Sequence, residues 1–153
     1  MMKAQVAVSL LLAIWLGVGS SCTKQEHSST EGAVAPQDAL ATFELDSAFQ
    51  MELVVHEPLI ASPVDMEIDE HGHMYVVEMP GYPLDDAKTG RVRKLYDTDQ
   101  DGVFDKSEIF IDKLSFPNSI MRWKQGFIVA DAPHILYFED TDQDGKADKC
   151  DTL

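Results

Sequence analysis

One acidic segment of twelve residues occurs twice in the chain, and the spacing of its two copies limits the fold. The first copy reads DTDQDGVFDKSE from Asp97, and the second reads DTDQDGKADKCD from Asp140, 43 residues later. Gly72 and Gly126 are 54 residues apart, and the extra 11 residues fall in the loop 79–90, which the second unit lacks. A repeat of about 40–45 residues with four short strands is typical of β-propeller blades.

The segments around these landmarks have the residue pattern of β-strands. In Val64-Asp-Met-Glu-Ile-Asp69 apolar and polar residues alternate, so that one face of the segment is apolar. Turn residues such as Glu70-His71-Gly72 separate the apolar runs. We predict no amphipathic helix after the N-terminal signal, and we predict strands over Gln50–His56, Val64–Asp69, His73–Glu78, Arg91–Tyr96, Glu108–Ile111, Ser119–Trp123, Phe127–Ala130 and His134–Phe138.

The predicted fold class is therefore all-β, with about two four-stranded blades over 43–113 and 114–153. Two blades cannot close a ring, so we expect this to be the N-terminal part of a longer, incomplete β-propeller. A β-sandwich with coincidental hairpins is the alternative, but it leaves the near-identical acidic loops unexplained.

The N-terminus has the features of an export signal. Met1-Met2-Lys3 is positively charged, Ala4–Val18 is mostly apolar, and Gly19-Ser-Ser-Cys22 places small residues before a cysteine. We predict a lipoprotein signal peptide over 1–21, a lipidated Cys22 and a flexible linker over 22–42. The protein would then be anchored in the cell envelope, facing the periplasm or the cell surface. An ordinary signal peptide with an incidental cysteine is the alternative.

The acidic copies satisfy the template of a calcium-binding loop. Calcium takes six to eight oxygen ligands, and alternate aspartates in a tight turn supply them. A bidentate twelfth residue completes such a set, and because Asp151 is shorter than Glu108 we expect weaker binding in the second loop. The predicted ligands are Asp97, Asp99, Asp101, the Val103 carbonyl, Asp105 and Glu108 in the first loop, and Asp140, Asp142, Asp144, the Lys146 carbonyl, Asp148 and Asp151 in the second.

No helices are predicted beside these loops, so they would be hairpin turns with a structural ion and not a helical calcium-binding hand. The alternative is that side-chain hydrogen bonds alone shape the turns. The net charge of −15 argues against a nucleic-acid partner. Tyr82, in a proline-rich loop, is the one candidate for substrate contact. Cys150 is either a free thiol or pairs with a cysteine elsewhere, and no Cys-x-x-Cys-His haem motif is present.

The stretch from about residue 43 to 153 resembles the N-terminal domain of the membrane-bound dehydrogenases of planctomycete and verrucomicrobial bacteria. This resemblance implies a six-bladed propeller similar to the soluble quinoprotein sugar dehydrogenases. Pyrroloquinoline quinone as a cofactor, downstream haem c and carbohydrate oxidation are also implied, but no catalytic residue can be transferred to this chain. The matching segments are Phe49–Pro58, Val76–Pro83, Gly90–Leu95 with the first acidic loop, Leu114–Pro117, and Ala132–Tyr137 with the second.

Two functions follow from these observations. The first is the propeller portion of an exported, lipid-anchored dehydrogenase that oxidises sugars or alcohols and passes electrons to a quinone or haem. The second is a non-catalytic, calcium-stabilised propeller module that binds glycans or proteins at the cell surface.

Overall fold

The computed structural model describes residues 32, 34–84 and 87–153. The predicted signal peptide, Cys22 and the first part of the predicted linker lie outside these residues. Within them, no helix is both long and apolar enough to cross a membrane. The elements are α1 (Pro36–Ala39), the 3-10 turn η1 (Leu40–Thr42), β1 (Pro63–Ile68), β2 (Met74–Glu78), β3 (Gly90–Tyr96), β4 (Lys106–Leu114), β5 (Pro117–Trp123), β6 (Gly126–Asp131), β7 (His134–Glu139) and β8 (Lys149–Thr152).

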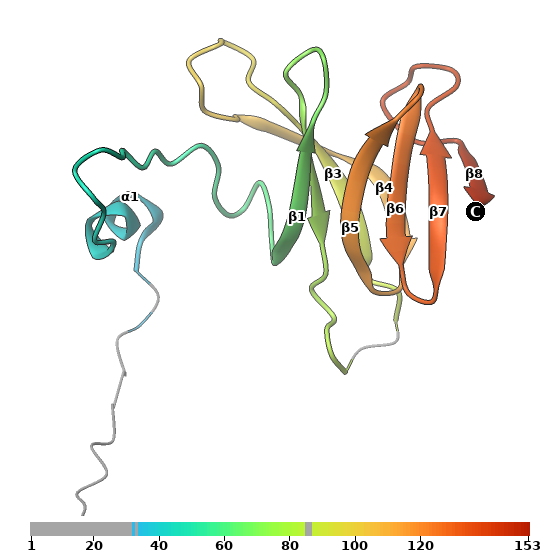
Figure 1. Ribbon diagram of the computed structural model, residues 1–153, viewed down its shortest axis with the longest axis horizontal. Coiled ribbons are helices and arrows are strands. Elements are labelled where there is room, and N and C mark those ends of the chain that lie inside the picture. Colours follow the sequence, from blue (N-terminus) through green and yellow to red (C-terminus); the bar gives the residue numbers. More distant parts are fainter. Residues whose placement is uncertain (1–31, 33, 85–86) are drawn as a thin grey trace, which may run out of the picture. The chain divides into compact units, whose positions relative to one another are not determined.

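The eight strands form two four-stranded antiparallel sheets, each connected in simple up-and-down order (Figure 1). The first sheet is β1-β2-β3-β4 and the second is β5-β6-β7-β8. The sheets do not close into a barrel, so the arrangement is that of two propeller-like blades. The all-β prediction is confirmed, and the chain passes from the first sheet to the second between Leu114 and Pro117.

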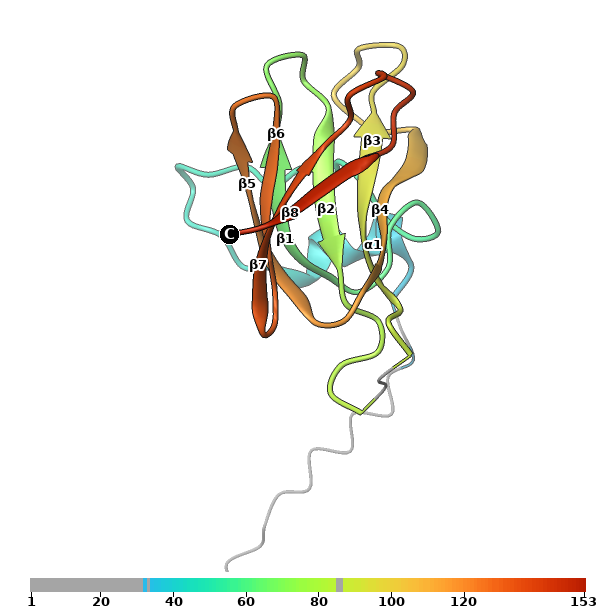
Figure 2. The ribbon, with the colours of Figure 1, turned by 90° about the vertical axis from the view of Figure 1, so that its right-hand side faces the viewer.

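All connections between odd and following even strands lie at one end of the sheets, which we call the acidic end (Figure 2). The β3–β4 loop and the β7–β8 loop are the two acidic segments, so both occupy the same corner of their blades. The β2–β3 connection, which includes Tyr82, lies at the opposite end, as does the short β6–β7 turn. The acidic repeat read from the sequence is thus a repeat in space, although the strand registers place ten of the eleven extra residues of blade one in the β2–β3 connection and one in the β1–β2 turn.

Four predictions need correction at the edges of these blades. The short strand predicted over Glu108–Ile111 is the longer β4, because it pairs along the whole of β3 with two register shifts. β8 was not predicted, because all four of its residues are exposed and show no apolar pattern. The end of the predicted linker contains α1, where Pro36 provides a favourable first helical residue, and η1.

The fourth correction concerns Gln50–His56, which the structure does not assign as a strand. This segment has no strand partner among the described residues. Its central apolar residues are half-buried, and Val54 and Val55 pack against the buried Met74, Val76 and Leu95 of blade one. The β-type composition was read correctly, but a strand also needs a neighbour to pair with.

The larger cluster of buried apolar residues lies between the two sheets. Three aromatic rings form its centre: Tyr75 lies 5.0 Å from Phe110 and 4.2 Å from Phe127, measured between ring centroids. Val92 of the first sheet and Val129 of the second are fully buried in the same cluster. Burial of apolar surface contributes roughly 25 cal/mol per Å². The apolar contact between the two sheets therefore stabilises the folded state.

A buried carboxylate stands at the end of the second strand of each blade. Glu78 is fully buried, accepts hydrogen bonds from Arg91 and from Arg93, and also accepts one from the Ala61 amide at 2.6 Å. Asp131 accepts hydrogen bonds from the backbone amides of Ser115 and Phe116 at 3.1 and 2.6 Å. In both blades the carboxylate thus fixes the segment that leads into the first strand.

Replacing Glu78 with glutamine should destabilise the fold. The substitution keeps an acceptor for the Ala61 amide but leaves two partly buried arginines without a counter-charge, which costs on the order of 3 kcal/mol. Urea unfolding of the variant checks the value. Glu67→Gln, on the neighbouring strand and without these partners, is the control, and equal stability of the two variants would contradict this role for Glu78.

Candidate functional site

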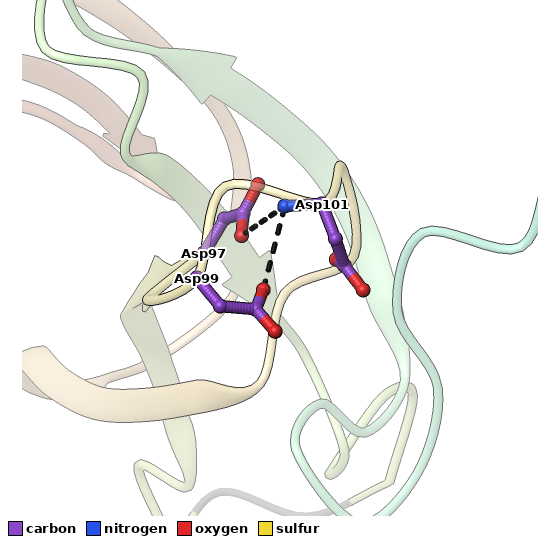
Figure 3. Close-up of side chains that lie close together, drawn as sticks. All are labelled: Asp97, Asp99 and Asp101. Atoms are coloured by element: carbon purple, nitrogen blue, oxygen red, sulfur yellow. Dashed lines mark hydrogen bonds between the residues drawn. The ribbon is translucent and has the colours of Figure 1, made fainter.

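The first acidic loop gathers three carboxylates at its centre. One oxygen from each of Asp97, Asp99 and Asp101 lies within 4.8 Å of the other two. Figure 3 shows Asp97 and Asp99 facing the backbone nitrogen of Asp101, which donates to both at 3.2 and 3.4 Å. The backbone of the loop is therefore held by hydrogen bonds to its own aspartate side chains.

Further amides complete the turn. The Gly102 amide donates to Asp97 at 2.9 Å, and the Val103 amide donates to Asp101 at 2.8 Å. Gly102 has a φ of 92°, which is favourable only for glycine, and Gln100 has a φ of 62°. The alternation of aspartate with a glycine at the sixth position is thus what allows the chain to reverse here.

The second loop reproduces this geometry. Asp140, Asp142 and Asp144 bring their oxygens within the same 4.8 Å. The amides of Asp144, Gly145 and Lys146 donate to these carboxylates over the same positions as in the first loop, at 2.8–3.2 Å for the matching bonds. Gly145 has a φ of 93°. The two copies of the acidic segment therefore adopt the same loop conformation.

The remaining predicted carboxylates turn to other partners. Asp105 accepts hydrogen bonds from the amide and hydroxyl of Thr98. Asp148 does the same with Thr141, and these bonds lower the pKa of Asp148. Both residues close the base of their loops. The structure thus brings together the first, third and fifth positions of the template but not the ninth.

The twelfth positions do not belong to the triplets and have other partners. Glu108, on β4, forms an ion pair with Lys106 at 3.0 Å and accepts a hydrogen bond from the Tyr96 hydroxyl at 3.0 Å. Asp151, on β8, lies 3.8 Å from the Lys149 ammonium. Since neither twelfth residue reaches its triplet, the difference in length between Glu108 and Asp151 no longer gives a reason for weaker binding in the second loop.

The donor set of each triplet fits a hard divalent cation. Carboxylate oxygens are the ligands that calcium prefers, and each carboxylate has oxygen lone pairs beyond those used by the backbone amides. The carbonyls of Val103 and Lys146 belong to the same turns. Calcium takes six to eight oxygen ligands, so an ion held by one such triplet would also need water or backbone oxygens.

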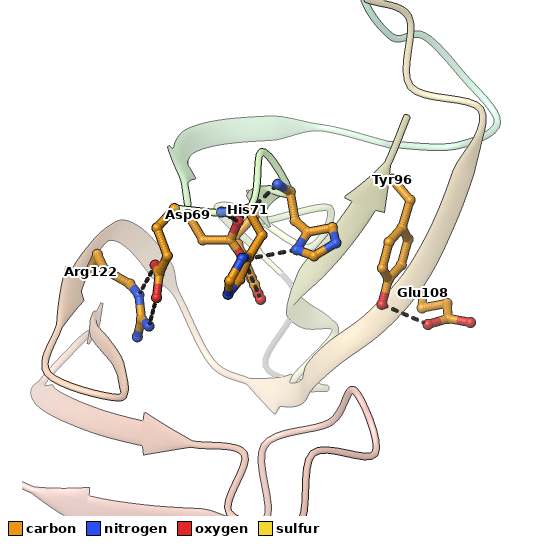
Figure 4. Close-up of polar contacts among 8 residues, drawn as sticks. Asp69, His71, Tyr96, Glu108 and Arg122 are labelled. Carbon is orange, nitrogen blue, oxygen red and sulfur yellow. Dashed lines mark hydrogen bonds and ion pairs between the residues drawn. The ribbon is translucent and has the colours of Figure 1, made fainter. Parts of the chain in front are cut away.

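A polar cleft between the blades was not predicted from the sequence. It has a volume of about 320 Å³ and opens at the acidic end. The Glu70 carboxylate, in the β1–β2 turn, pairs with the Arg122 guanidinium of β5 at 3.1 and 3.3 Å (Figure 4). Arg122 also donates to the Gly126 carbonyl at 2.8 Å. This two-point ion pair joins the turns of the two blades.

The side chain of Asp69 lies beside this pair and is almost completely buried. Burial opposes its ionisation, but hydrogen bonds from the His73 ring and from the amides of His73 and His71 hold the net pKa of Asp69 below its ordinary value. The sequence signal that could have located this residue is the aspartate immediately before a Glu-His-Gly turn.

Tyr82 lies at the end opposite the acidic loops. Its side chain is 65% exposed, and its ring centroid is 6.4 Å from that of Phe116. Together with Met79, Pro83 and Ala132 these rings line a shallow, mainly apolar depression. The structure thus places the predicted substrate-contact residue away from both metal-binding candidates.

Cys150 is a free, exposed thiol on β8. Partial burial of its sulfur and the neighbouring Asp151 carboxylate raise the pKa of Cys150. A thiol that is mostly protonated at neutral pH is a poor nucleophile. The geometry therefore gives no support for a reactive cysteine.

The chain belongs to a family defined by a domain of unknown function, DUF7133, whose profile matches residues 35–153. The match covers both blades and begins just before α1. No curated protein matches the chain, and no solved structure matches it.

We expect the Asp69→Asn substitution to weaken the acid dependence of stability. Because the folded-state pKa of Asp69 is lowered, its contribution is present above the unfolded pKa of about 3.9 and is lost as pH falls through the folded value. Urea unfolding between pH 7 and pH 2.5 measures this dependence. The control is Asp112→Asn, an exposed carboxylate that accepts a bond from the Lys113 amide. Parallel profiles for the two variants would contradict this assignment.

Proposed function

We propose that this member of the DUF7133 family is a calcium-stabilised module of propeller blades that binds one structural ion in each acidic loop. The observation that supports this most strongly is the pair of aspartate triplets, each within 4.8 Å, at the same corner of two blades. A chance acidic surface would not reproduce both the triplet and its backbone hydrogen bonds.

Electrostatics favours a cation at these positions. Two unit charges about 4 Å apart repel by roughly 1 kcal/mol in water and by more near a protein surface. Each loop holds three such charges, in a chain whose formal net charge is −15. The amides that donate into the triplets offset part of this repulsion, and a bound calcium ion would offset the rest.

The loops are placed so that an ion would stabilise contacts between elements. In the second loop the Ala147 amide donates to the carbonyl of Phe110, on β4 of the first blade, at 2.9 Å. In the first loop the Phe104 amide donates to the Val54 carbonyl at 2.8 Å. Ordering each loop by a cation therefore also orders the backbone that joins one blade to the element before it.

A dehydrogenase role is the second candidate, and the exposed ring of Tyr82 above Phe116 favours it. Aromatic faces of this kind stack on sugar rings, and these rings lie at the end of the blades that the acidic loops leave free. A haem-attachment motif in a longer reading frame, together with sugar-dependent dye reduction by that protein, would distinguish this candidate from a purely binding module.

Attachment through a lipidated Cys22 remains part of the proposal, since a diacylated cysteine gives stable anchoring without a membrane-spanning helix. Expression of the Cys22→Ser chain tests it by fractionation. The substituted protein should leave the membrane fraction, and an unchanged distribution would contradict the lipid anchor.

Calcium should raise the thermal stability of the protein, and the triplets should account for the rise. A ligand at 100 times its dissociation constant stabilises the folded state by about 2.7 kcal/mol per site. Asp99→Asn with Asp142→Asn keeps both turn acceptors but removes one charge per triplet, so we expect most of the calcium-dependent shift in melting temperature to disappear. Thermal melts in calcium and in chelator measure the effect.

Two variants serve as controls. Glu108→Gln changes the twelfth template position, and since Glu108 contacts Tyr96 and Lys106 instead of the triplet, the calcium shift should be retained. Asp112→Asn removes an exposed charge outside both loops and should also retain it. Equal melting of the parent protein in calcium and in chelator would overturn the proposal.

A further inference from the structure

The segment 51–56 lies against blade one without belonging to a sheet. Its Val54 carbonyl accepts a hydrogen bond from the Phe104 amide of the first acidic loop at 2.8 Å. Leu53 and Val55, on either side, are half-buried. No other described residue donates to or accepts from the backbone of Leu53 or Val55. An apolar segment with unpaired backbone groups is an open strand edge.

In blade two, the residue equivalent to Phe104 is hydrogen-bonded to a β-strand of the neighbouring blade. There the Ala147 amide donates to the carbonyl of Phe110, on β4, at 2.9 Å. Phe104 and Ala147 are the same residue of the repeat, 43 positions apart. Val54 therefore corresponds to Phe110. The segment 51–56 lies against blade one as β4, the outer strand of blade one, lies against blade two.

The pairing of β4 with β3 shows which backbone groups of the segment 51–56 would face a neighbouring strand. The two neighbours of Phe110 on β4 are Ile109 and Ile111, which pair with Arg93 and Val92 of β3. The corresponding neighbours of Val54 are Leu53 and Val55. The residues without hydrogen-bond partners are thus the ones that would pair with a third strand of another sheet.

The face of blade one beside this segment is apolar and exposed. Met66 pairs with Val76 as Ile120 pairs with Val129 in the second blade, so Met66 and Ile120 are equivalent. Ile120 is 5% exposed because blade one covers it, whereas Met66 is 53% exposed. Val64 and Ile68 extend the same uncovered apolar face, which forms a groove against the segment.

We propose that residues 51–56 form the outer strand of a further β-blade of the same repeat type, which packs on the Met66 face. This partner is an antiparallel sheet that has an apolar face and three strands of its own, with an open outer edge. The groove continues the established contact between the blades, because it is the same face of the repeat that blade one covers in blade two. The inference does not depend on calcium binding.

An intact second copy does not meet this description. Its second blade already carries β8 on the outer edge, where Cys150 pairs with Phe138 and Thr152 pairs with Leu136. That strand would occupy the place of residues 51–56. The proposal therefore predicts that the chain stays monomeric unless the β7 edge is opened.

The test uses residues 23–153, which contain both blades, and a variant with Cys150→Pro and Asp151→Pro. One of these two amides faces β7 in an antiparallel pair, so the variant frees the β7 edge. Its second blade becomes the probe for the groove of another copy. In sedimentation equilibrium, the average mass of the variant should rise with concentration to at least twice that of the parent protein, both in calcium and in chelator.

Further substitutions in this open-edge background locate the contact. Leu53→Pro removes an amide that faces the partner, and Met66→Glu places a charge on the groove; each should weaken association at least tenfold. Glu52→Pro removes the adjacent amide, which faces the other side of the strand, and should leave association unchanged. Circular dichroism confirms that each variant is folded. A monomeric open-edge variant, an associating parent, or association insensitive to Leu53→Pro and Met66→Glu would each overturn the proposal.

Discussion

The stacking of one sheet face on the other is the interaction on which the structure depends. Tyr75, Phe110 and Phe127 meet at the centre of this contact, and fully buried valines surround them. A single four-stranded sheet would leave this apolar face in water, so the cluster between the blades forms only where the two sheets meet. The same contact aligns the acidic loops at one end and the Tyr82 loop at the other.

The repeat explains which features could be predicted from the sequence. The 43-residue spacing and the Gly-containing turns located both blades and seven of the eight strands, because alternating apolar residues mark strands that bury one face. β8 was not predicted, because its residues are all exposed and show no apolar alternation. Residues 51–56 have strand composition but no partner to pair with. The buried Glu78 and the cleft around Asp69 depend on contacts between distant segments, which local patterns do not record.

The acidic loops show how far a motif predicts geometry. Three carboxylates converge as the calcium template requires, those of Asp97, Asp99 and Asp101. The ninth residue, Asp105, instead accepts a hydrogen bond from Thr98. The twelfth, Glu108, contacts Tyr96 and Lys106. A flanking helix, which would aim the twelfth residue inward, is replaced here by a β-strand. The loop sequence therefore specifies the turn and its three central carboxylates, while the surrounding fold determines whether the other ligands reach them.

We propose that the two blades are copies of one unit whose acidic loops are equivalent calcium sites. Isothermal titration calorimetry of the folded protein with calcium measures the number of ions bound per chain and their dissociation constants. We expect two ions per chain with dissociation constants within about threefold of each other, and one ion after Asp142→Asn, because each loop holds one aspartate triplet. Absence of binding, or a single site that Asp142→Asn leaves intact, would contradict it.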